Sequence, residues 1–481
     1  MSTKTTKSYM TIAHVIIMFA LMFGIGKLQP FGTVTPMGMN ILGIFVGTLY
    51  GWLFLDLLWP SLLALVGLGM TGYMTVGEAF SQALSSATGI QVILTAVFAV
   101  ALGKVGAVDV LSNFLLTRES LQKNPWLLVL TLFLTVVIGT IFGAGLALVF
   151  MIWSLVIGAA EKCGYGSKHP LVGFIMASTV ILAFTGSHIV PFKGGALLYL
   201  SFFVPTAGEI EYVPFMIFAL TYTAFIIVGL MLVARFIMKI DASGFRLPKE
   251  DIEEIRNKEI TLQQKLGCIV MIAFFVVMMA PTFMPKEFIL TKLISGMGLM
   301  GITTLALMLL ALIKDDNGKF VLKLSECHAG VPWDIVWLIC ATMPLATAME
   351  SKECGLMQTV VATLSPVFAS MPPAVFMVIV MVVLGLLTQV THNLVLGAMF
   401  IPFLTTVAMD IGANHYTLFM MLMFTLNCAY VTPAASMQSA LIHGNETIGK
   451  KAAYTWGISV FIISCIVLAV VGIPLGNILW P

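Results

Sequence analysis

The chain has little charge. Only 10% of its 481 residues are Asp, Glu, Lys or Arg, whereas 59% are hydrophobic, and the mean hydropathy is +1.04. A soluble domain carries about 25% charged residues, so this composition excludes a soluble globular protein and predicts a polytopic membrane protein. The net charge of +2 gives no reason to expect a nucleic-acid partner.

Reactive motifs are also scarce. The seven cysteines include no CxxC pair, which predicts reduced thiols buried in apolar surroundings. The sequence has no HExxH, no GxSxG-like nucleophile and no paired intramembrane carboxylates, so we do not expect an enzyme or a bound cofactor. The first apolar stretch, Tyr9 to Gly26, has no convincing cleavage site and is expected to be a transmembrane helix.

Long apolar segments make up most of the chain. Eleven are long enough to span a bilayer, near residues 9–26, 36–56, 58–74, 88–106, 170–204, 212–238, 264–284, 290–313, 332–350, 415–443 and 453–478. The stretches 125–160 and 372–411 are apolar but interrupted. We therefore expect an all-α polytopic membrane protein with about 11 transmembrane helices and two re-entrant helical hairpins.

The interruptions fall at Ile141–Gly145 and Val390–Asn393, each between apolar arms of about 15 residues. Each hairpin is followed by a long apolar segment that is itself broken, at Thr185–Ser187 and at Thr432–Ala434. Unwound backbone at membrane depth is tolerated only where it is buried or lines a cavity. Paired breaks in corresponding positions of two halves indicate the substrate site of a transporter.

The two halves are similar to each other. Residues 143–164 can be laid over residues 391–412 without gaps, and the order of hairpin, broken helix and final helix occurs twice. An odd number of spans in the first unit makes the second unit inverted. With the N-terminus in the cytoplasm, 18 Lys and Arg residues face inside and 4 face outside, with Lys104 and Lys193 at membrane depth. This bias predicts a cytoplasmic N-terminus and an extracytoplasmic C-terminus in the cell membrane.

Several segments resemble the divalent anion–sodium symporter family, which moves dicarboxylates, citrate or sulfate. The resemblance runs from about Thr35 to Pro481 and rests on Val331–Ile335, Glu353–Leu356, Thr391–Leu394 with Ile401-Pro402, Thr432–Gly444 and Thr185–Pro191. It implies a homodimer in which a transport domain moves as an elevator against a scaffold domain. It also implies a substrate held between hairpin tips and helix breaks, with a sodium site beside each tip.

On this basis the chain divides into an N-terminal helix (1–34), two scaffold parts (35–124 and 264–371), two transport parts (125–240 and 372–481) and a cytoplasmic linker (241–263). Three features depart from the family pattern. The first tip has no hydroxyl or amide side chain, the second tip contains His392, and the first break contains Lys193. The sequence therefore predicts a divergent member.

Four half-helices are expected to begin at membrane depth, after Gly145, Lys193 and Asn393 and near Ser436. Their free N–H groups and positive dipole ends suit an anion; the alternative is that these residues are only caps and turns. The predicted substrate-binding residues are Gly143, Ala144, Gly145, Thr185, Gly186, Ser187, Lys193, Thr391, His392, Asn393, Thr432, Pro433, Ala434 and Ser436. The ion-coupling candidates are Lys193, His188, His392 and Asn393; if sodium is the coupling ion, its sites are expected near Gly143, Ser187, Asn393 and Thr432.

These features predict a secondary active transporter of a small organic anion such as a dicarboxylate. Three modes of coupling remain open. Transport is coupled to sodium, or to protons through His392, or it is an exchange in which Lys193 and His392 act as fixed cations. One alternative is a permease for a monoanion such as arsenite or a short-chain fatty acid. An anion channel is another.

Overall fold

The computed structural model describes residues 2–107, 110, 124–141, 145–192, 194–247, 253, 259–285, 287–315, 318–433 and 435–481. Within these ranges the regular structure is helical, and the β-pairing consists of one isolated bridge between Lys314 and Phe320. The all-α fold class is confirmed.

The first half contains the helices α1 (Ser2–Gly24), α2 (Pro36–Phe54), α3 (Leu58–Gly69), α4 (Val76–Leu84), α5 (Ala87–Val105), α7 (Pro125–Ile141), α8 (Gly145–Lys162), α9 (Pro170–Gly186), α10 (Gly194–Ala207) and α11 (Tyr212–Leu232). The second half contains α13 (Leu262–Phe283), α14 (Ile289–Ala311), α15 (Trp333–Glu350), α16 (Leu356–Ala369), α17 (Pro373–Leu387), α18 (Asn393–Asp410), α19 (His415–Asn427), α20 (Met437–His443), α21 (Gly449–Val467) and α22 (Ile473–Leu479). Short helical turns follow α1 (η1, Ile25–Lys27) and precede α15 (η4, Leu324–Glu326; η5, His328–Gly330).

Among the described residues, eight helices are long and apolar enough to cross a membrane, and the number rises to ten if each of two bent helix pairs is one span. Four shorter apolar helices, α3, α7, α9 and α10, add to these. They include one arm of the first hairpin and both parts of the first broken helix. An interrupted apolar segment yields short helices of this kind. With its many apolar helices, the chain is a multi-pass membrane protein.

The same sequence of elements occurs in both halves. The hairpin α7–α8 is followed by the broken helix α9/α10 and by α11, and the hairpin α17–α18 is followed by α19/α20 and by α21. Both final helices also continue into a π-helical turn, at Val233–Ile237 after α11 and at Leu468–Gly472 after α21. A π-helical turn is rare, so its recurrence at matching positions supports two related repeats.

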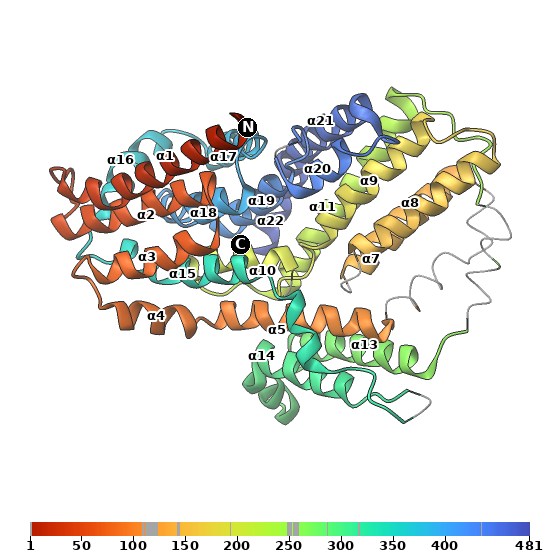
Figure 1. Ribbon diagram of the computed structural model, residues 1–481, viewed down its shortest axis with the longest axis horizontal. Coiled ribbons are helices and arrows are strands. Elements are labelled where there is room, and N and C mark those ends of the chain that lie inside the picture. Colours follow the sequence, from red (N-terminus) through yellow and green to blue (C-terminus); the bar gives the residue numbers. More distant parts are fainter. Residues whose placement is uncertain are drawn as a thin grey trace.

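The repeats pack against each other through their later helices. Helix α9 contacts α7 and α8 of its own hairpin and also α20 and α21 of the other half, while α10 packs along α18. In Figure 1, α7, α8 and α9 lie at one end of the molecule, α16 to α18 lie with α1 to α3 at the other, and α5, α13 and α14 run below. The two broken helices meet between these ends.

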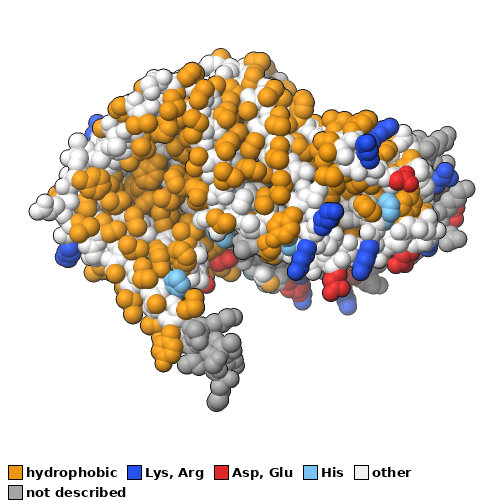
Figure 2. Space-filling model, turned by 90° about the horizontal axis from the view of Figure 1, so that it is seen from above, with side chains coloured by type: hydrophobic (Ala, Val, Ile, Leu, Met, Phe, Trp, Pro, Cys, Tyr) orange, Lys and Arg blue, Asp and Glu red, His pale blue; other side chains and the backbone are white. Residues whose placement is uncertain are grey.

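The outer surface is apolar over most of its area. Figure 2 shows one face covered largely by hydrophobic side chains, with most of the visible charged side chains gathered towards one end. Side chains such as Ile16, Val228 and Ile272 are more than half exposed although they lie within long apolar helices. Such a band is typical of a surface that contacts lipid.

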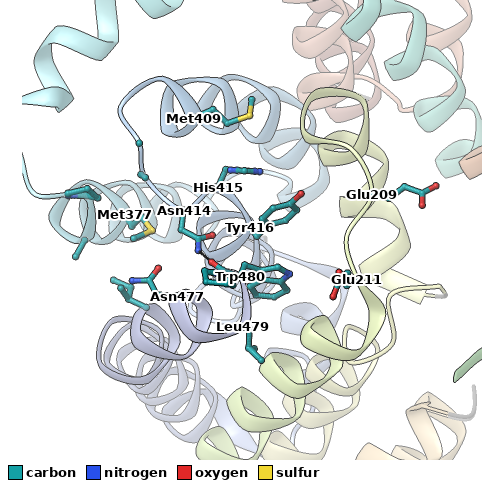
Figure 3. A pocket seen from close by; sticks show the side chains of 16 residues that line it. Glu209, Glu211, Met377, Met409, Asn414, His415, Tyr416, Asn477, Leu479 and Trp480 are labelled. Atoms are coloured by element: carbon teal, nitrogen blue, oxygen red, sulfur yellow. Dashed lines mark hydrogen bonds between the residues drawn. The ribbon is translucent and has the colours of Figure 1, made fainter. Parts of the chain in front are cut away.

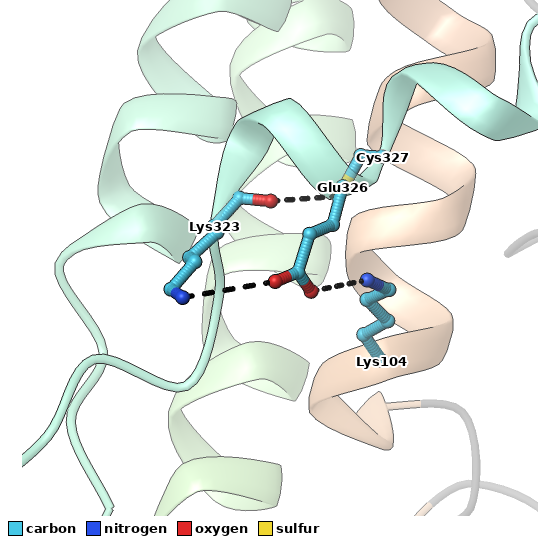
Figure 4. Close-up of polar contacts among 4 residues, drawn as sticks. All are labelled: Lys104, Lys323, Glu326 and Cys327. Atoms are coloured by element: carbon cyan, nitrogen blue, oxygen red, sulfur yellow. Dashed lines mark hydrogen bonds and ion pairs between the residues drawn. The ribbon is translucent and has the colours of Figure 1, made fainter.

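One ion pair ties the end of α5 to the turns before α15. Lys104, in the last turn of α5, places its Nζ 2.9 Å from Oε2 of Glu326. Lys323 approaches the other carboxylate oxygen at 4.0 Å (Figure 4). The ammonium of Lys104 therefore has a carboxylate partner from the second half of the chain.

Candidate functional site

The described half-helices begin at the breaks expected from the sequence. Helix α8 begins at Gly145, α10 at Gly194 and α18 at Asn393. Helix α20 begins at Met437, after Ser436, whose hydroxyl accepts from the N–H of Ser439 at 3.0 Å. Each start presents backbone N–H groups without helical partners.

Three of these starts converge on one space, which we call the central cavity, with a volume of about 750 Å³. Its walls come from α2, α9, α10, α15, the tip of the second hairpin and the break between α19 and α20. The polar side chains that line it are Ser187, His188, Tyr199, Asp334, Thr391, His392, Asn393, Asn427, Ser436 and Gln438. Residues separated by more than 200 positions thus share one cavity.

The central cavity suits an anion on one wall and a cation on another. The starts of α10, α18 and α20 direct positive dipole ends towards it, which favours a carboxylate. Asp334, in the first turn of α15, contributes a carboxylate. Because a negative side chain repels an anion and attracts a cation, this wall suits a coupling ion or a protonated histidine.

His392 occupies the N-cap position of α18. Its carbonyl oxygen accepts from the N–H groups of Val395 and Leu396 at 3.1 and 3.2 Å, while its imidazole makes no capping hydrogen bond. Next to it, Asn393 donates from Nδ2 to Oδ1 of Asn427 at 3.3 Å, which links the hairpin tip to the end of α19. The imidazole of His392 is exposed towards the cavity and is not used for capping.

A smaller cavity of about 280 Å³ adjoins the central cavity, since Ser187, Leu198 and Ile335 line both. Gly145, the described part of the first hairpin tip, lines this smaller cavity with Thr140 of α7. The two hairpins therefore approach neighbouring spaces on either side of Ser187.

The second hairpin is joined to the second helix break by buried side chains. Gln389 donates from Nε2 to the carbonyl oxygens of Gly385 and Cys428, both at 2.8 Å, and its Oε1 accepts from the N–H of Val431 at 3.0 Å. The Thr388 hydroxyl donates to the carbonyl of Leu426 at 2.9 Å. The hairpin and the break are thereby held as one unit.

The predicted site residues divide into four groups, one of which is Gly145 alone, in the smaller cavity. Those that line the central cavity are Ser187, His188, Thr391, His392, Asn393 and Ser436. Those that line neither of the two cavities are Thr185, Gly186, Thr432 and Pro433. Those that lie outside the described residues are Gly143, Ala144, Lys193 and Ala434.

Three of the residues that line neither cavity have other contacts. The Thr185 hydroxyl donates to the carbonyl of Ile181 at 3.0 Å within α9. A Cβ at Gly186 would lie 3.3 Å from the carbonyl oxygen of Val137, so this glycine lets α7 pack closely on α9. The Thr432 hydroxyl donates to the carbonyl of Gln389. These three positions serve packing and bracing in this structure.

Sequence reasoning missed Tyr199, Asn427 and Asp334. Tyr199 lies one helical turn after Gly195, on the face of α10 that follows the first break, and Asn427 is the last residue of the otherwise apolar α19. An amide at the end of a broken apolar helix is a signal that could have identified Asn427. Asp334 belongs to Val331–Ile335, one of the segments that resemble the symporter family, but nothing in the sequence indicated that α15 reaches the cavity.

A larger cavity of about 950 Å³ lies elsewhere, between the starts of α17 and α19 and the end of α22. Its labelled side chains include Glu209, Glu211, His415, Tyr416 and Trp480 (Figure 3). None of the predicted site residues lines it, and its two carboxylates oppose an anion. The central cavity is therefore the better candidate for the functional site.

The second repeat matches a known family. Residues 269–480 match the family model described as the sodium:sulfate symporter transmembrane region. A similar curated protein is the sodium-dependent dicarboxylate transporter SdcS of Staphylococcus saprophyticus subsp. saprophyticus, 26% identical over 146 residues. SdcS of Staphylococcus aureus is 25% identical over 146 residues. Each alignment covers 30% of this chain and 28% of the relative, so under a third of the relative's length is matched.

A solved structure extends the likeness to most of the fold. The crystal structure of the Alcanivorax borkumensis YdaH transporter, described as having an unusual topology, matches with a TM-score of 0.55 and 12% sequence identity. The match covers 82% of this chain and 86% of that one. At this identity the likeness is one of fold.

Proposed function

We infer that this chain is a secondary active transporter of a small organic anion. The inference follows from its place, as a divergent member, in the divalent anion–sodium symporter family. The matched family and the curated relatives are transporters, which agrees with the expectation that the chain is not an enzyme. A dicarboxylate-like substrate and sodium as the coupling ion are the finer parts of this proposal.

The observation that carries the proposal is the convergence of three helix starts on the central cavity. Backbone N–H groups at helix starts bind carboxylates without needing a positively charged side chain. A volume of about 750 Å³ lies within the usual range of small-molecule sites, roughly 300–1,000 Å³. The cavity also takes walls from both repeats, as expected of a site between repeats.

We propose that sodium is a co-substrate, carried together with the anion. Among the described residues, no group of three or more His, Cys, Asp or Glu side chains could hold a metal ion. Hard cations prefer oxygen ligands, and the tip and break of the second half offer side-chain amide oxygens at Asn393 and Asn427 and a hydroxyl oxygen at Ser436, all of which line the central cavity. This oxygen-only chemistry fits a sodium ion that binds and leaves during each cycle.

We propose that transport proceeds by an elevator motion in a homodimer in the cytoplasmic membrane. The support within the chain is the bracing of the second hairpin by Gln389 and Thr388, which keeps the tip and the break at fixed positions relative to each other. A unit held in this way can move as a rigid body.

The test is uptake by purified protein in proteoliposomes. Labelled succinate, citrate, sulfate, acetate and arsenite are each supplied with a sodium gradient, with a proton gradient, or with unlabelled counter-substrate inside. Saturable, sodium-driven uptake of a di- or tricarboxylate is the expected result. Uptake of monoanions alone would favour the monoanion permease, and non-saturating flux that needs no counter-substrate would favour a channel.

A further inference from the structure

We propose that the hydrogen bond between Thr206 and Glu350 is a latch, which holds the transport parts of the chain at one position against the scaffold parts and opens in each transport cycle. The Thr206 hydroxyl donates to Oε1 of Glu350 at 2.5 Å, and both side chains are half-buried. Neither residue lines the central cavity, so both are positioning residues and do not bind the anion. The inference rests on the proposed elevator motion, because a latch requires two units that move relative to each other.

This hydrogen bond joins the two units. Thr206 lies in the last turn of α10, in the transport part 125–240, and Glu350 is the last residue of α15, in the scaffold part 264–371. The two helices pack against each other near the middle of the molecule (Figure 1). Among the hydrogen bonds and ion pairs between described residues that are distant in the sequence, this is the one that crosses from a transport part to a scaffold part.

Elsewhere the two units meet through apolar rings. Phe45 of α2 packs on Phe403 of α18 with ring centroids 5.9 Å apart, and Phe192, just before α10, packs on Phe274 of α13 at the same distance. Apolar packing has no preferred direction, whereas a hydrogen bond is lost when its donor and acceptor move apart or out of line. Apolar surfaces of this kind can slide past each other, and the hydrogen bond selects one position among those that sliding allows.

The local surroundings of Glu350 do not favour a carboxylate. It ends α15, where the negative end of the helix dipole opposes an acidic side chain. It also lines a cavity of about 20 Å³, whose other walls include Trp52 of α2, Met357 of α16 and Phe403 of α18, and apolar walls disfavour a charge. The donor that compensates for these surroundings is the Thr206 hydroxyl. Because a water molecule needs roughly 10–15 Å³, water can take the place of this hydroxyl when α10 moves away, so the latch can open.

Distances between two spin labels measure the position of the transport parts directly. One label is placed at Lys168, in the loop between α8 and α9, and the other at Lys265 of α13; both side chains are exposed, and they belong to a transport part and a scaffold part. The labels are attached through genetically encoded keto amino acids, so the native cysteines stay in place. The full-length protein is measured in liposomes, first without substrate and then with sodium and succinate. An elevator motion gives two distances, whose ratio reports the populations of the two positions.

Removing either partner of the latch should shift this ratio. In Thr206→Val and in Glu350→Leu we expect the described position to lose population against the second one by about tenfold or more, the effect of one hydrogen bond to a charged group. The double variant should shift no further than the larger single shift, because both changes remove the same contact. Thr206→Ser keeps the hydroxyl and should retain the wild-type ratio. The matched control is Thr347→Val, one turn earlier on α15, whose hydroxyl donates to the carbonyl of Met343 at 3.0 Å within the same helix; it should leave the ratio unchanged.

Several results would overturn the inference. Two distances whose ratio is the same in the wild type, Thr206→Val and Glu350→Leu would remove the latch and leave the elevator motion standing. A single distance in every protein, with and without sodium and succinate, would remove the elevator motion and the latch together. If one variant fails to fold, the other decides, because each removes the same hydrogen bond. Uptake by the unlabelled wild type tests the transport function separately, and its absence for every anion would remove that function whatever the distances show.

Discussion

Gln389 Nε2 lies 2.8 Å from the carbonyl oxygen of Cys428, and this hydrogen bond joins the second hairpin to the second helix break across 39 residues of chain. The Oε1 atom of the same side chain accepts from Val431, so one amide satisfies two backbone groups within the unwound segment 428–436. Buried backbone groups without partners are costly in a membrane. The break persists because this glutamine pairs groups that a continuous helix would pair internally.

Replacing Gln389 by leucine should therefore destabilise the protein and abolish transport. Each buried group left unpaired costs about 1–3 kcal/mol, so we expect a clear loss of thermal stability in detergent together with loss of uptake. Gln82→Leu is the matched control, because Gln82 lies exposed on α4. Wild-type stability in Gln389→Leu would show that the bracing is unimportant.

Gly195→Ala should disrupt the central cavity. The added Cβ would collide with Nε2 of His188, and the imidazole has little room to move because Nδ1 is bonded to Phe184. We expect uptake to fall by at least tenfold, which corresponds to about 1.4 kcal/mol. Gly158→Ala on α8 is the control, since nothing lies within 4 Å of a Cβ built there; equal uptake by the two variants would contradict the close packing at the start of α10.

Asp334→Asn should weaken ion coupling more than anion binding. Asp334 supplies the carboxylate among the described side chains that line the central cavity, and a negative charge favours a cation there. We expect the sodium or proton dependence of uptake to be reduced or shifted to higher ion concentrations, while the anion still stabilises the protein in thermal-shift measurements. Asp410→Asn, at the exposed end of α18, is the control. If anion-induced stabilisation is lost and ion dependence is kept, the assignment of Asp334 to the cation is wrong.

Lys104→Met should change transport little. The pair with Glu326 is short, at 2.9 Å, but both side chains are well exposed, at 37% and 54%. Exposed ion pairs contribute little because water and salt screen them. Uptake near the wild-type rate and a small shift in melting temperature are expected. A variant with intact folding but no uptake would instead assign Lys104 a role in the transport cycle.

The interrupted helices were predictable from the sequence because of one simple rule: a helix that crosses a bilayer needs a minimum length of apolar residues. An apolar arm of about 15 residues next to glycine or to Thr391-His392-Asn393 cannot be an ordinary span, and α8 and α18 begin where that rule placed them. Ser187 and Ser436 were also recognisable, since small polar residues at a break serve as caps and turns. Both line the central cavity.

The rest of the site depended on packing between distant segments. Tyr199 resembles any aromatic residue of an apolar helix, and its importance comes only from its position beside His188 and Gly397. Asp334 reaches the cavity because α15 packs against α10, a contact with no local signal in either segment. Thr185 and Thr432 looked equivalent to the lining residues in the sequence, yet their hydroxyls bond backbone carbonyls outside the cavity.

The sequence by itself determined that this is a membrane protein of interrupted helices in two similar halves, because hydrophobic length and helix-breaking residues are local properties. Only the tertiary structure decided which polar side chains share a cavity and which are consumed in bracing. That choice depends on which atoms of two folded segments come within hydrogen-bonding distance. Such contacts as Gln389 with Cys428 or the start of α10 against His188 are made only when the two repeats pack together.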